Sequence, residues 1–251
     1  MASAVAWRIY MAHIRQIMML ETSSPLAVRR AVSFCEALHE GHQTVEGVRA
    51  KRADSPNEVR ACWKKGCIAV CSDPEWKLPA KFHPDVVVDA ILAKKNLGTA
   101  MNEAPLVIGL GPGFIAGQDV HMVVETNRGH HLGRIITDGR AETNTGIPVS
   151  INGYALERVL RAPCEGEFKT ACSIGDPVKK GEPIGMVAAD TIRAQIDGVL
   201  RGLIRSATQV RPGLKIGDID PRGDARLCQA ISDKSRAISG SVLEAILRVY
   251  N

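Results

Sequence analysis

The sequence predicts a two-domain α/β protein in which a parallel, doubly wound sheet precedes a mostly β domain and a C-terminal helical segment. Apolar runs alternate with helical patterns in the first half, and a buried run ends in the glycine-rich loop Gly109–Gly113. A 32-residue repeat then begins at Ala162. We expect the domains to span residues 1–117 and 118–222, with residues 223–251 packing back on the first domain.

The first domain follows a Rossmann-like order but lacks its beginning. Ala2–Met11 predicts a helix, Ile14–Leu20 predicts a strand, and Glu21 is an acid at the end of that strand. A dinucleotide-binding unit runs strand, glycine loop, helix, strand, acid, so the first strand and its Gly-rich loop are missing here. We expect the chain to be a shortened form of a longer protein, with a strand and a glycine turn preceding Met1.

Helices and strands alternate over the rest of this domain. Helices are expected over residues 24–40, 56–65 and 91–97, and the first two open on Ser-Pro pairs. Strands are expected at 67–72, 85–90 and 104–108, with a short strand or turn at 45–49. This alternation implies parallel strands joined by right-handed crossovers.

The pattern becomes all-β after the glycine loop. Strands are expected at 119–126 and 133–137, and the 32-residue repeat follows. Its matching pairs are Ala162 and Ala194, Gly166 and Gly198, Val178 and Val210, Gly181 and Gly213, Ile184 and Ile216, Gly185 and Gly217, and Val187 and Ile219. Short apolar strands with glycine-marked turns in each copy predict two interlocked β-hammerheads. Helices are expected at 224–231 and 241–249.

Composition excludes several classes of function. The net charge is +5 with the basic pairs scattered, and aromatic residues make up 4%, so stacking platforms for nucleic acid are not expected. No apolar run approaches the length that spans a bilayer, so no membrane partner is expected. Seven cysteines without a secretory signal predict free thiols and a cytoplasmic location.

Two loops are the candidate ligand-binding elements. Gly109, Gly111 and Gly113 let backbone N–H groups converge on an anion, and Glu21 stands where an acid accepts from ribose hydroxyls. In the polar turn Glu125–His131, Asn127 and Arg128 are candidate cofactor-binding residues, and His130 is a candidate acid or base. The alternatives are a tight interdomain turn for the first loop, a solvated acid for Glu21, and a turn that ties the domains together for the second.

Other reactive side chains favour structural roles. Cys62, Cys67 and Cys71 are spaced too widely for a zinc site, and the last two lie in a buried strand, so inert buried thiols are expected rather than a sulfur relay. Asp218, Asp220 and Arg222 favour a structural ion-pair cluster over a divalent-ion site. No metal site is expected.

The second domain resembles the barrel-sandwich hybrid fold of lipoyl and biotinyl carrier domains. The likeness rests on the stretch IGDPVKKGE at residues 174–182. Those carriers present a lysine at the turn between their halves, whereas this turn is Ala188-Ala189-Asp190-Thr191. The departure predicts that neither biotin nor lipoate is attached and that the domain binds or docks.

Several longer phrases resemble the accessory proteins of the selenium-dependent molybdenum hydroxylase system. They are VVVDAILAKKN at 86–96, APLVIGLGPGF at 104–114, DVHMVVETNRGHHLGRII at 119–136, LRGLIR at 200–205, KIGDIDPR at 215–222 and SDKSRAISGSVLEAIL at 232–247. The resemblance implies a maturation factor for molybdenum hydroxylases, with a hydroxylase subunit as partner. We expect a nucleotide or the molybdopterin cofactor to bind in a cleft between the domains, formed by the glycine loop and the polar turn. The alternatives are a nucleotide-dependent oxidoreductase or transferase using the same cleft, and a docking module with no small ligand.

Overall fold

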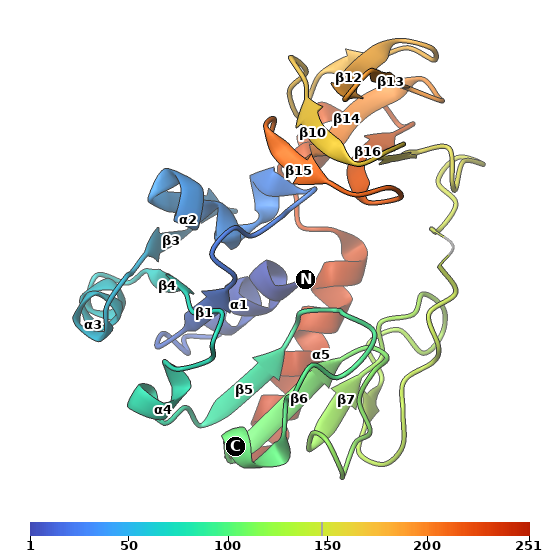
Figure 1. Ribbon diagram of the computed structural model, residues 1–251. Helices are drawn as coiled ribbons and strands as arrows, with labels where there is room; N and C mark the ends of the chain where they lie inside the picture. Colours follow the sequence, from blue (N-terminus) through green and yellow to red (C-terminus); the bar gives the residue numbers. More distant parts are fainter. Residues whose placement is uncertain (147) are drawn as a thin grey trace. The chain divides into compact units, whose positions relative to one another are not determined.

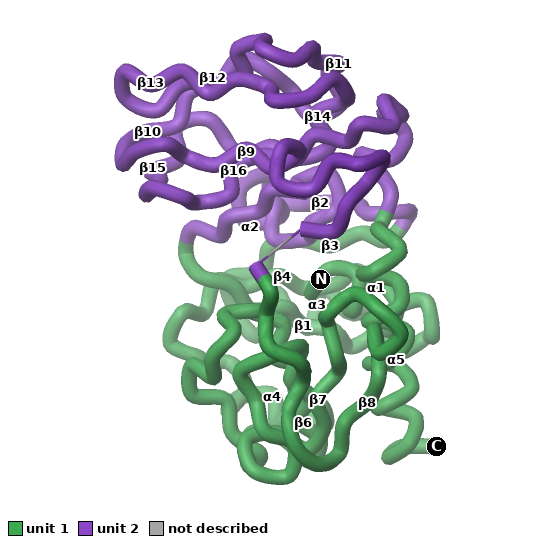
Figure 2. Tube along the Cα trace, turned by 90° about the vertical axis from the view of Figure 1, so that its right-hand side faces the viewer, with its two compact units in different colours: residues 1–23, 48–145, 231–251 green, residues 24–47, 146–230 purple. Residues whose placement is uncertain are grey.

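The protein has an α/β fold that divides into two compact units (Figures 1 and 2). The structure, a computed structural model, describes residues 1–146 and 148–251. Unit 1 contains residues 1–23, 48–145 and 231–251, and unit 2 contains residues 24–47 and 146–230. This division differs from the expected boundary after residue 117, because the polar turn belongs to unit 1 and a segment from the first half belongs to unit 2.

The first sheet of unit 1 contains three parallel strands in the order β1-β4-β3. These are β1 (Met18–Glu21), β4 (Ile68–Ser72) and β3 (Val48–Arg52). Helix α3 (Pro56–Lys64) joins β3 to β4 and begins as predicted, with the Ser55 hydroxyl accepting from the Glu58 amide. The strand expected at 67–72 is also confirmed, since four of the five β4 residues are buried.

The second sheet of unit 1 has the order β5-β6-β7-β8. The strands are β5 (Val86–Asp89), β6 (Leu106–Leu110), β7 (Met122–Val124) and β8 (Ile135–Ile136). The first three are parallel, and β8 is antiparallel to β7. The short helix α4 (Pro79–Phe82) precedes β5. All five β6 residues are buried, as the apolar run predicts for a central parallel strand.

Two helices cover one face of the second sheet. Helix α1 (Ala2–Met11) confirms the predicted N-terminal helix, and α5 (Asp233–Tyr250) begins eight residues before the expected 241–249. Val5 and Ile9 of α1 share a buried cluster with side chains of α5, β6 and β7. The Ser232 hydroxyl accepts from the Ser235 amide and caps α5.

The helix expected at 24–40 is not formed as a continuous element. The chain makes two 3₁₀ turns, Arg30–Val32 and Phe34–Glu36, and then α2 (Ala37–Glu40) and strand β2 (His42–Val45). The Arg30 guanidinium donates to the carbonyl of Leu203 at 2.8 Å, so this segment is fixed by the β structure of unit 2. Long-range contacts here override the local helical spacing.

The prediction of a helix at 91–97 is also wrong. Leu92 and Lys94 have φ values of 61° and 63°, which end a right-handed helix. The Asn96 side chain accepts from the amides of Gly98 and Thr99 at 2.8 Å each. An asparagine that bonds its own loop in this way favours a turn over a helix.

Unit 2 contains two antiparallel sheets of four strands each. Their orders are β13-β12-β10-β15 and β11-β14-β16-β9. The strands are β9 (Val159–Arg161), β10 (Gly166–Lys169), β11 (Pro177–Val178), β12 (Pro183–Val187), β13 (Asp190–Arg193), β14 (Gly198–Leu203), β15 (Thr208–Val210) and β16 (Lys215–Asp220). The helix expected at 224–231 is a 3₁₀ turn, Ala225–Cys228.

The strand pairing of unit 2 repeats with the offset seen in the sequence. Phe168 pairs with Val187 in one sheet, and Leu200 pairs with Ile219 in the other, each shifted by 32 positions. The β-bulges after Pro183 and Lys215 are also 32 positions apart. When the copies are divided at the Ala188–Ala189 hairpin, β9–β12 belong to the first and β13–β16 to the second. Each sheet then takes two strands from each copy, and a shared core that includes Phe168 and Leu200 lies between them.

The helices of the described residues contain no apolar stretch long enough to cross a bilayer.

Candidate functional site

Three parallel strands of unit 1 end together at one edge of the second sheet. The register pairs Asp89 with Gly109 and Leu110 with Val124, so the carboxyl ends of β5, β6 and β7 lie in adjacent positions. The glycine loop and the polar turn start from neighbouring strands of the same sheet. Ligands of open α/β sheets bind outside this edge, and we call it the β5–β7 edge.

The glycines of the loop are required by close packing. Gly111 and Gly113 have φ values of 76° and 119°, which side chains rarely adopt. A Cβ on Gly113 would lie 2.7 Å from the backbone nitrogen of Lys95, and one on Gly111 would collide with the Thr126 hydroxyl. Gly109 lies inside β6, where a Cβ would press on the Phe114 ring. The loops after the three strands therefore touch one another.

Two consecutive amides in the glycine loop have no hydrogen-bond acceptor within the part of the chain that the structure describes. The Gly111 amide donates to the Val124 carbonyl at 2.9 Å, and the Ile115 amide donates to the Asp119 carboxylate at 2.8 Å. Between them, the amides of Gly113 and Phe114 donate to no group of the described residues. Successive free amides in a loop with positive φ are the elements of an anion-binding nest.

The polar turn is organised by two carboxylates. Glu125, 2% exposed, accepts from the amides of Asn127 at 2.6 Å and Glu142 at 2.7 Å. The Glu142 carboxylate in turn accepts from the Asn127 side chain at 2.6 Å and contacts Nδ1 of His131 at 2.9 Å. The bond from Asn127 and then that with His131 lower the pKa of Glu142. These bonds fix the turn, so Asn127 has a structural partner.

The predicted phosphate-binding guanidinium is paired within unit 1. Arg128 donates two parallel bonds of 2.8 Å to Asp233, in the first turn of α5. The hydrogen bonds from Arg128 to this carboxylate raise the pKa of the arginine. Binding of a phosphate by Arg128 therefore requires exchange of one anionic partner for another.

His130 and Glu21 have weaker links to this edge. His130 is exposed, and no hydrogen bond or ion pair in the described part of the chain orients its ring. Glu21 ends β1, a strand of the other sheet, where burial raises its pKa although the Met1 amino group opposes the shift. The structure thus brings Gly111, Gly113, Asn127 and Arg128 to the β5–β7 edge.

The cysteines in and next to strand β4 are buried thiols. Cys62, Cys67 and Cys71 are at most 6% exposed. Burial, more than the neighbouring Cys67, raises the pKa of Cys62 to about 12, and burial likewise raises that of Cys71 to about 12. A thiolate is the reactive form, so neither thiol is suited to sulfur transfer. Among the described residues, no group of three or more His, Cys, Asp or Glu side chains is arranged to hold a metal ion.

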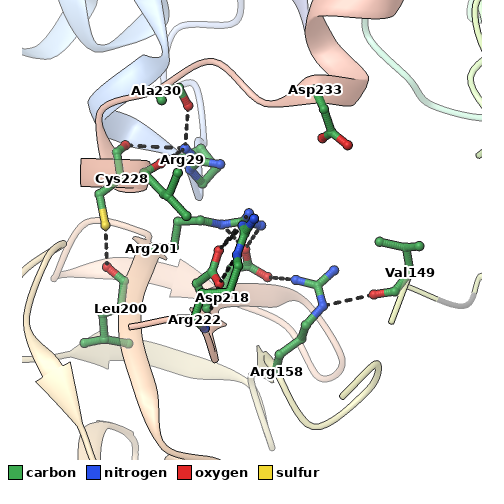
Figure 3. A network of polar contacts seen from close by, with 12 residues as sticks. Arg29, Val149, Arg158, Leu200, Arg201, Asp218, Arg222, Cys228, Ala230 and Asp233 are labelled. Atoms are coloured by element: carbon green, nitrogen blue, oxygen red, sulfur yellow. Dashed lines mark hydrogen bonds and ion pairs between the residues drawn. The ribbon is translucent and has the colours of Figure 1, made fainter. Parts of the chain in front are cut away.

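A buried charge cluster in unit 2 surrounds the two predicted aspartates (Figure 3). Asp218 is 1% exposed and accepts from Arg158 at 2.7 Å and from Nε of Arg201 at 2.9 Å. Asp220, fully buried, accepts from Arg222 at 2.6 Å and Arg201 at 3.3 Å. The cluster confirms the structural ion pairing expected for these aspartates.

Cations outnumber carboxylates in this cluster. Lys215 lies 3.4 Å from Asp218, and Arg29 donates to the carbonyls of Leu227 and Ala230 at 3.0 and 2.9 Å. Burial, assisted by the charge of Arg201, lowers the pKa of Arg29 to about 10. Arg29, Arg158, Arg201 and Lys215 were not predicted as members of this cluster. The only local signal was Lys215, three residues before Asp218.

Acid is expected to destabilise unit 2. Burial opposes ionisation of Asp218, but the charges of Lys215, Arg201 and Arg158 outweigh it and lower the pKa of this carboxyl. At Asp220, Arg222 and Arg201 likewise outweigh burial and lower the pKa. At low pH the unfolded chain therefore binds more protons than the folded chain. The stabilisation that the two ionised aspartates give is complete above the unfolded-state pKa of about 3.9, and it is lost as pH falls through the lower pKa values of the folded state. Urea unfolding followed by circular dichroism between about pH 6 and pH 2 measures this loss. Asp218→Asn should show a shallower pH dependence, and an unchanged dependence would contradict the assignment.

Comparison with known proteins finds a longer relative that matches the whole of this chain. No family model matches the chain. The chain is 46% identical over 250 residues to YqeB of Escherichia coli K12, described as an uncharacterized protein, and spans 46% of that protein's length. Among solved structures, an aspartoacylase family protein from Mesorhizobium loti is 21% identical over 35% of this chain and 27% of that chain, with a TM-score of 0.24. The ectoine utilization protein EutE (DoeB) from Ruegeria pomeroyi is 14% identical over 35% and 28%, also at 0.24.

Proposed function

We propose that this protein is an accessory factor in the maturation of molybdenum hydroxylases and that unit 1 binds a phosphate-bearing ligand at the β5–β7 edge. The ligand class is a nucleotide or the molybdopterin cofactor. The supporting observation is the meeting of three parallel strand ends with the unpaired amides of Gly113 and Phe114. The site proposed here lies within unit 1 and replaces the expected cleft between domains.

The chemistry of the edge suits an anion. The Gly113 and Phe114 amides supply neutral donors, and Lys95, an exposed residue, packs its backbone directly against Gly113. Arg128 supplies a two-pronged cationic donor once it leaves Asp233. The proposed roles are thus phosphate binding for the loop amides and Arg128, and positioning of the polar turn for Asn127.

Unit 2 is proposed to be a docking module of the lipoyl-like, barrel-sandwich type, just as unit 1 is proposed to be Rossmann-like. Each of its two sheets combines strands from both copies of a repeat, which supports the barrel-sandwich assignment of unit 2. The hairpin between β12 and β13 carries Ala188 and Ala189, so its partner is a protein surface such as a hydroxylase subunit rather than an attached cofactor. All seven cysteines are free, which supports a cytoplasmic location.

Substitution at Arg128 is expected to weaken ligand binding. A charged hydrogen-bond pair contributes about 1.5–3 kcal/mol, so Arg128→Ala should raise the Kd about 10-fold or more. Mass analysis of small molecules released from gently purified protein identifies the ligand, and calorimetry with that compound measures Kd. Arg134→Ala, which removes an equally exposed positive charge nearby, should change Kd little.

The variant Asp233→Asn distinguishes a ligand-binding role of Arg128 from a purely structural one. If Arg128 only holds α5 to the polar turn, Asp233→Asn and Arg128→Ala will have the same effect. If Arg128 binds the ligand, freeing it from Asp233 should leave affinity unchanged or increase it. Parallel losses in the two variants, or a purified protein that retains no ligand and binds no nucleotide or pterin, would contradict the proposed site. Turnover of the ligand that is lost in His130→Ala would instead establish an enzyme.

A further inference from the structure

A hollow of about 560 Å³ in unit 1 is bordered by residues that precede strands, whereas the β5–β7 edge lies where strands end. Three segments line it: the loop before β1, helix α3 and the end of α4. The lining residues are Arg15, Gln16, Arg60, Trp63, Lys64, Lys81 and Phe82. Small-molecule sites commonly have volumes of about 300–1,000 Å³, so the hollow is large enough for a ligand of that size.

The hollow is strongly cationic. Among the seven described residues that line it, four are cations and none is an acid. The side chains of Arg60, Lys64 and Lys81 form no hydrogen bond or ion pair with any residue that the structure describes. The carboxyl end of a helix favours a cation such as Lys64, but Arg15 and Lys81 come from other segments. A cleft lined by charges of one sign concentrates ions of the opposite sign, so this hollow is suited to an anion.

Helix α3 presents part of the lining on one face. Trp63 and Lys64 follow Arg60 by three and four positions, so the three side chains are neighbours on the helix surface. The Trp63 indole donates to the carbonyl of Ile17 at 2.8 Å. Its ring meets the Phe82 ring edge to face, with the centroids 5.3 Å apart. These contacts hold the indole in one orientation, which lowers the entropic cost of binding a ligand against it.

Aromatic rings also hold the two guanidinium groups of the hollow. The guanidinium of Arg60 lies 5.2 Å from the centre of the Phe82 ring, and that of Arg15 lies 3.9 Å from the centre of the Tyr10 ring. Arg15 also contacts Nδ1 of His13 at 3.1 Å. Stacking on a ring leaves the N–H donors of a guanidinium available for a phosphate. The hollow thus combines oriented cationic donors with an aromatic wall.

We propose that this hollow binds a nucleoside polyphosphate, with its phosphates against the four cations and its base against Trp63 and Phe82. Arginine and lysine donate charged hydrogen bonds to phosphate oxygens, and every base has a π face that stacks on aromatic rings. The other basic pairs of the chain are scattered, which favours a small ligand over a nucleic-acid strand. Since the hollow and the β5–β7 edge border opposite ends of β5, the two sites are separate and this one does not depend on the proposed function.

Tryptophan fluorescence of the 251-residue chain tests the site. ATP is titrated at an ionic strength of about 0.15 M, which screens non-specific attraction. Tripolyphosphate and adenosine are titrated separately as the two halves of the ligand. ATP should change the emission, and Trp63→Phe should abolish most of that change. ATP should also bind about 10-fold more tightly than either half, because each half lacks one of the two sets of contacts.

Matched variants locate the binding. Arg60→Gln and Lys64→Gln should each raise the Kd for ATP about 10-fold or more. Lys65→Gln removes the same charge from an exposed neighbour outside the lining and should change the Kd little. Arg128→Ala, at the β5–β7 edge, should leave the fluorescence titration unchanged, so a failure of that site is distinguishable from a failure of this one.

Several results would overturn the proposal. They are the absence of ATP binding, equal losses in Lys64→Gln and Lys65→Gln, and binding that Arg128→Ala weakens but Arg60→Gln does not. Equal affinities for ATP and tripolyphosphate would reject a nucleoside ligand. Tighter binding of a single-stranded oligonucleotide than of ATP would identify nucleic acid as the occupant and reject the proposal.

Discussion

Asp218→Asn is expected to unfold unit 2 under conditions in which the native chain is stable. The substitution removes the charge that Arg158 and Arg201 share, and their side chains are 7% and 15% exposed. Removing one partner of a buried ion pair costs about 3–5 kcal/mol, because the remaining charges stay buried without compensation. That is a large part of a typical domain's stability of about 5–15 kcal/mol.

The position of the tryptophans helps to localise this loss. Trp7, Trp63 and Trp76 all belong to unit 1, so their fluorescence reports that unit, whereas far-ultraviolet circular dichroism reports both. An early circular-dichroism transition with an unchanged fluorescence midpoint is expected for Asp218→Asn. Asp224→Asn, at an exposed pair with Arg226, should leave both midpoints unchanged. Equal midpoints for the two variants would refute the role of Asp218.

Phe168→Ala is expected to destabilise the same unit by a different route. Phe168 is fully buried at the centre of the core that the two sheets share, and its loss should cost about 3–5 kcal/mol. Leu200, its counterpart in the second copy, is equally buried, and Leu200→Ala should cost about 2–5 kcal/mol. Urea unfolding followed by circular dichroism gives both values.

The control lies on β12, the strand that pairs with β10. Met186 of β12 is 45% exposed, so Met186→Ala should have a small effect on the free energy of unfolding. If the two copies contribute equally, the Phe168 and Leu200 variants will lower stability together and the Met186 variant will not. A large loss in only one of the core variants would show that the structural repeat is not matched by its energetics.

The sequence predicted the elements whose pattern is local. Helix α1 and strand β4 follow from apolar spacing, and α3 follows from its Ser-Pro start, because these signals act within a few residues. The 24–40 segment failed because Arg30 is held by a carbonyl 173 positions away. The 91–97 segment failed because left-handed residues such as Leu92 interrupt an otherwise helical composition.

The same distinction applies to the candidate sites. The glycine loop and the polar turn were identifiable because each is a short polar or flexible stretch after an apolar strand, and parallel pairing makes them neighbours. The pairing of Arg128 with Asp233 spans 105 positions, and that of Arg158 with Asp218 spans 60. No local pattern in one sequence specifies such partners, so Arg158 and Arg201, the distant members of the ionic cluster of unit 2, became visible only in three dimensions.

The strand exchange in unit 2 means that neither copy of the repeat possesses a sheet of its own. A chain severed at the Ala188–Ala189 hairpin would yield two fragments, with four of the six strand pairings of unit 2 running from one fragment to the other. Such fragments would have to associate in order to fold. Joining the two copies in one polypeptide makes this association intramolecular.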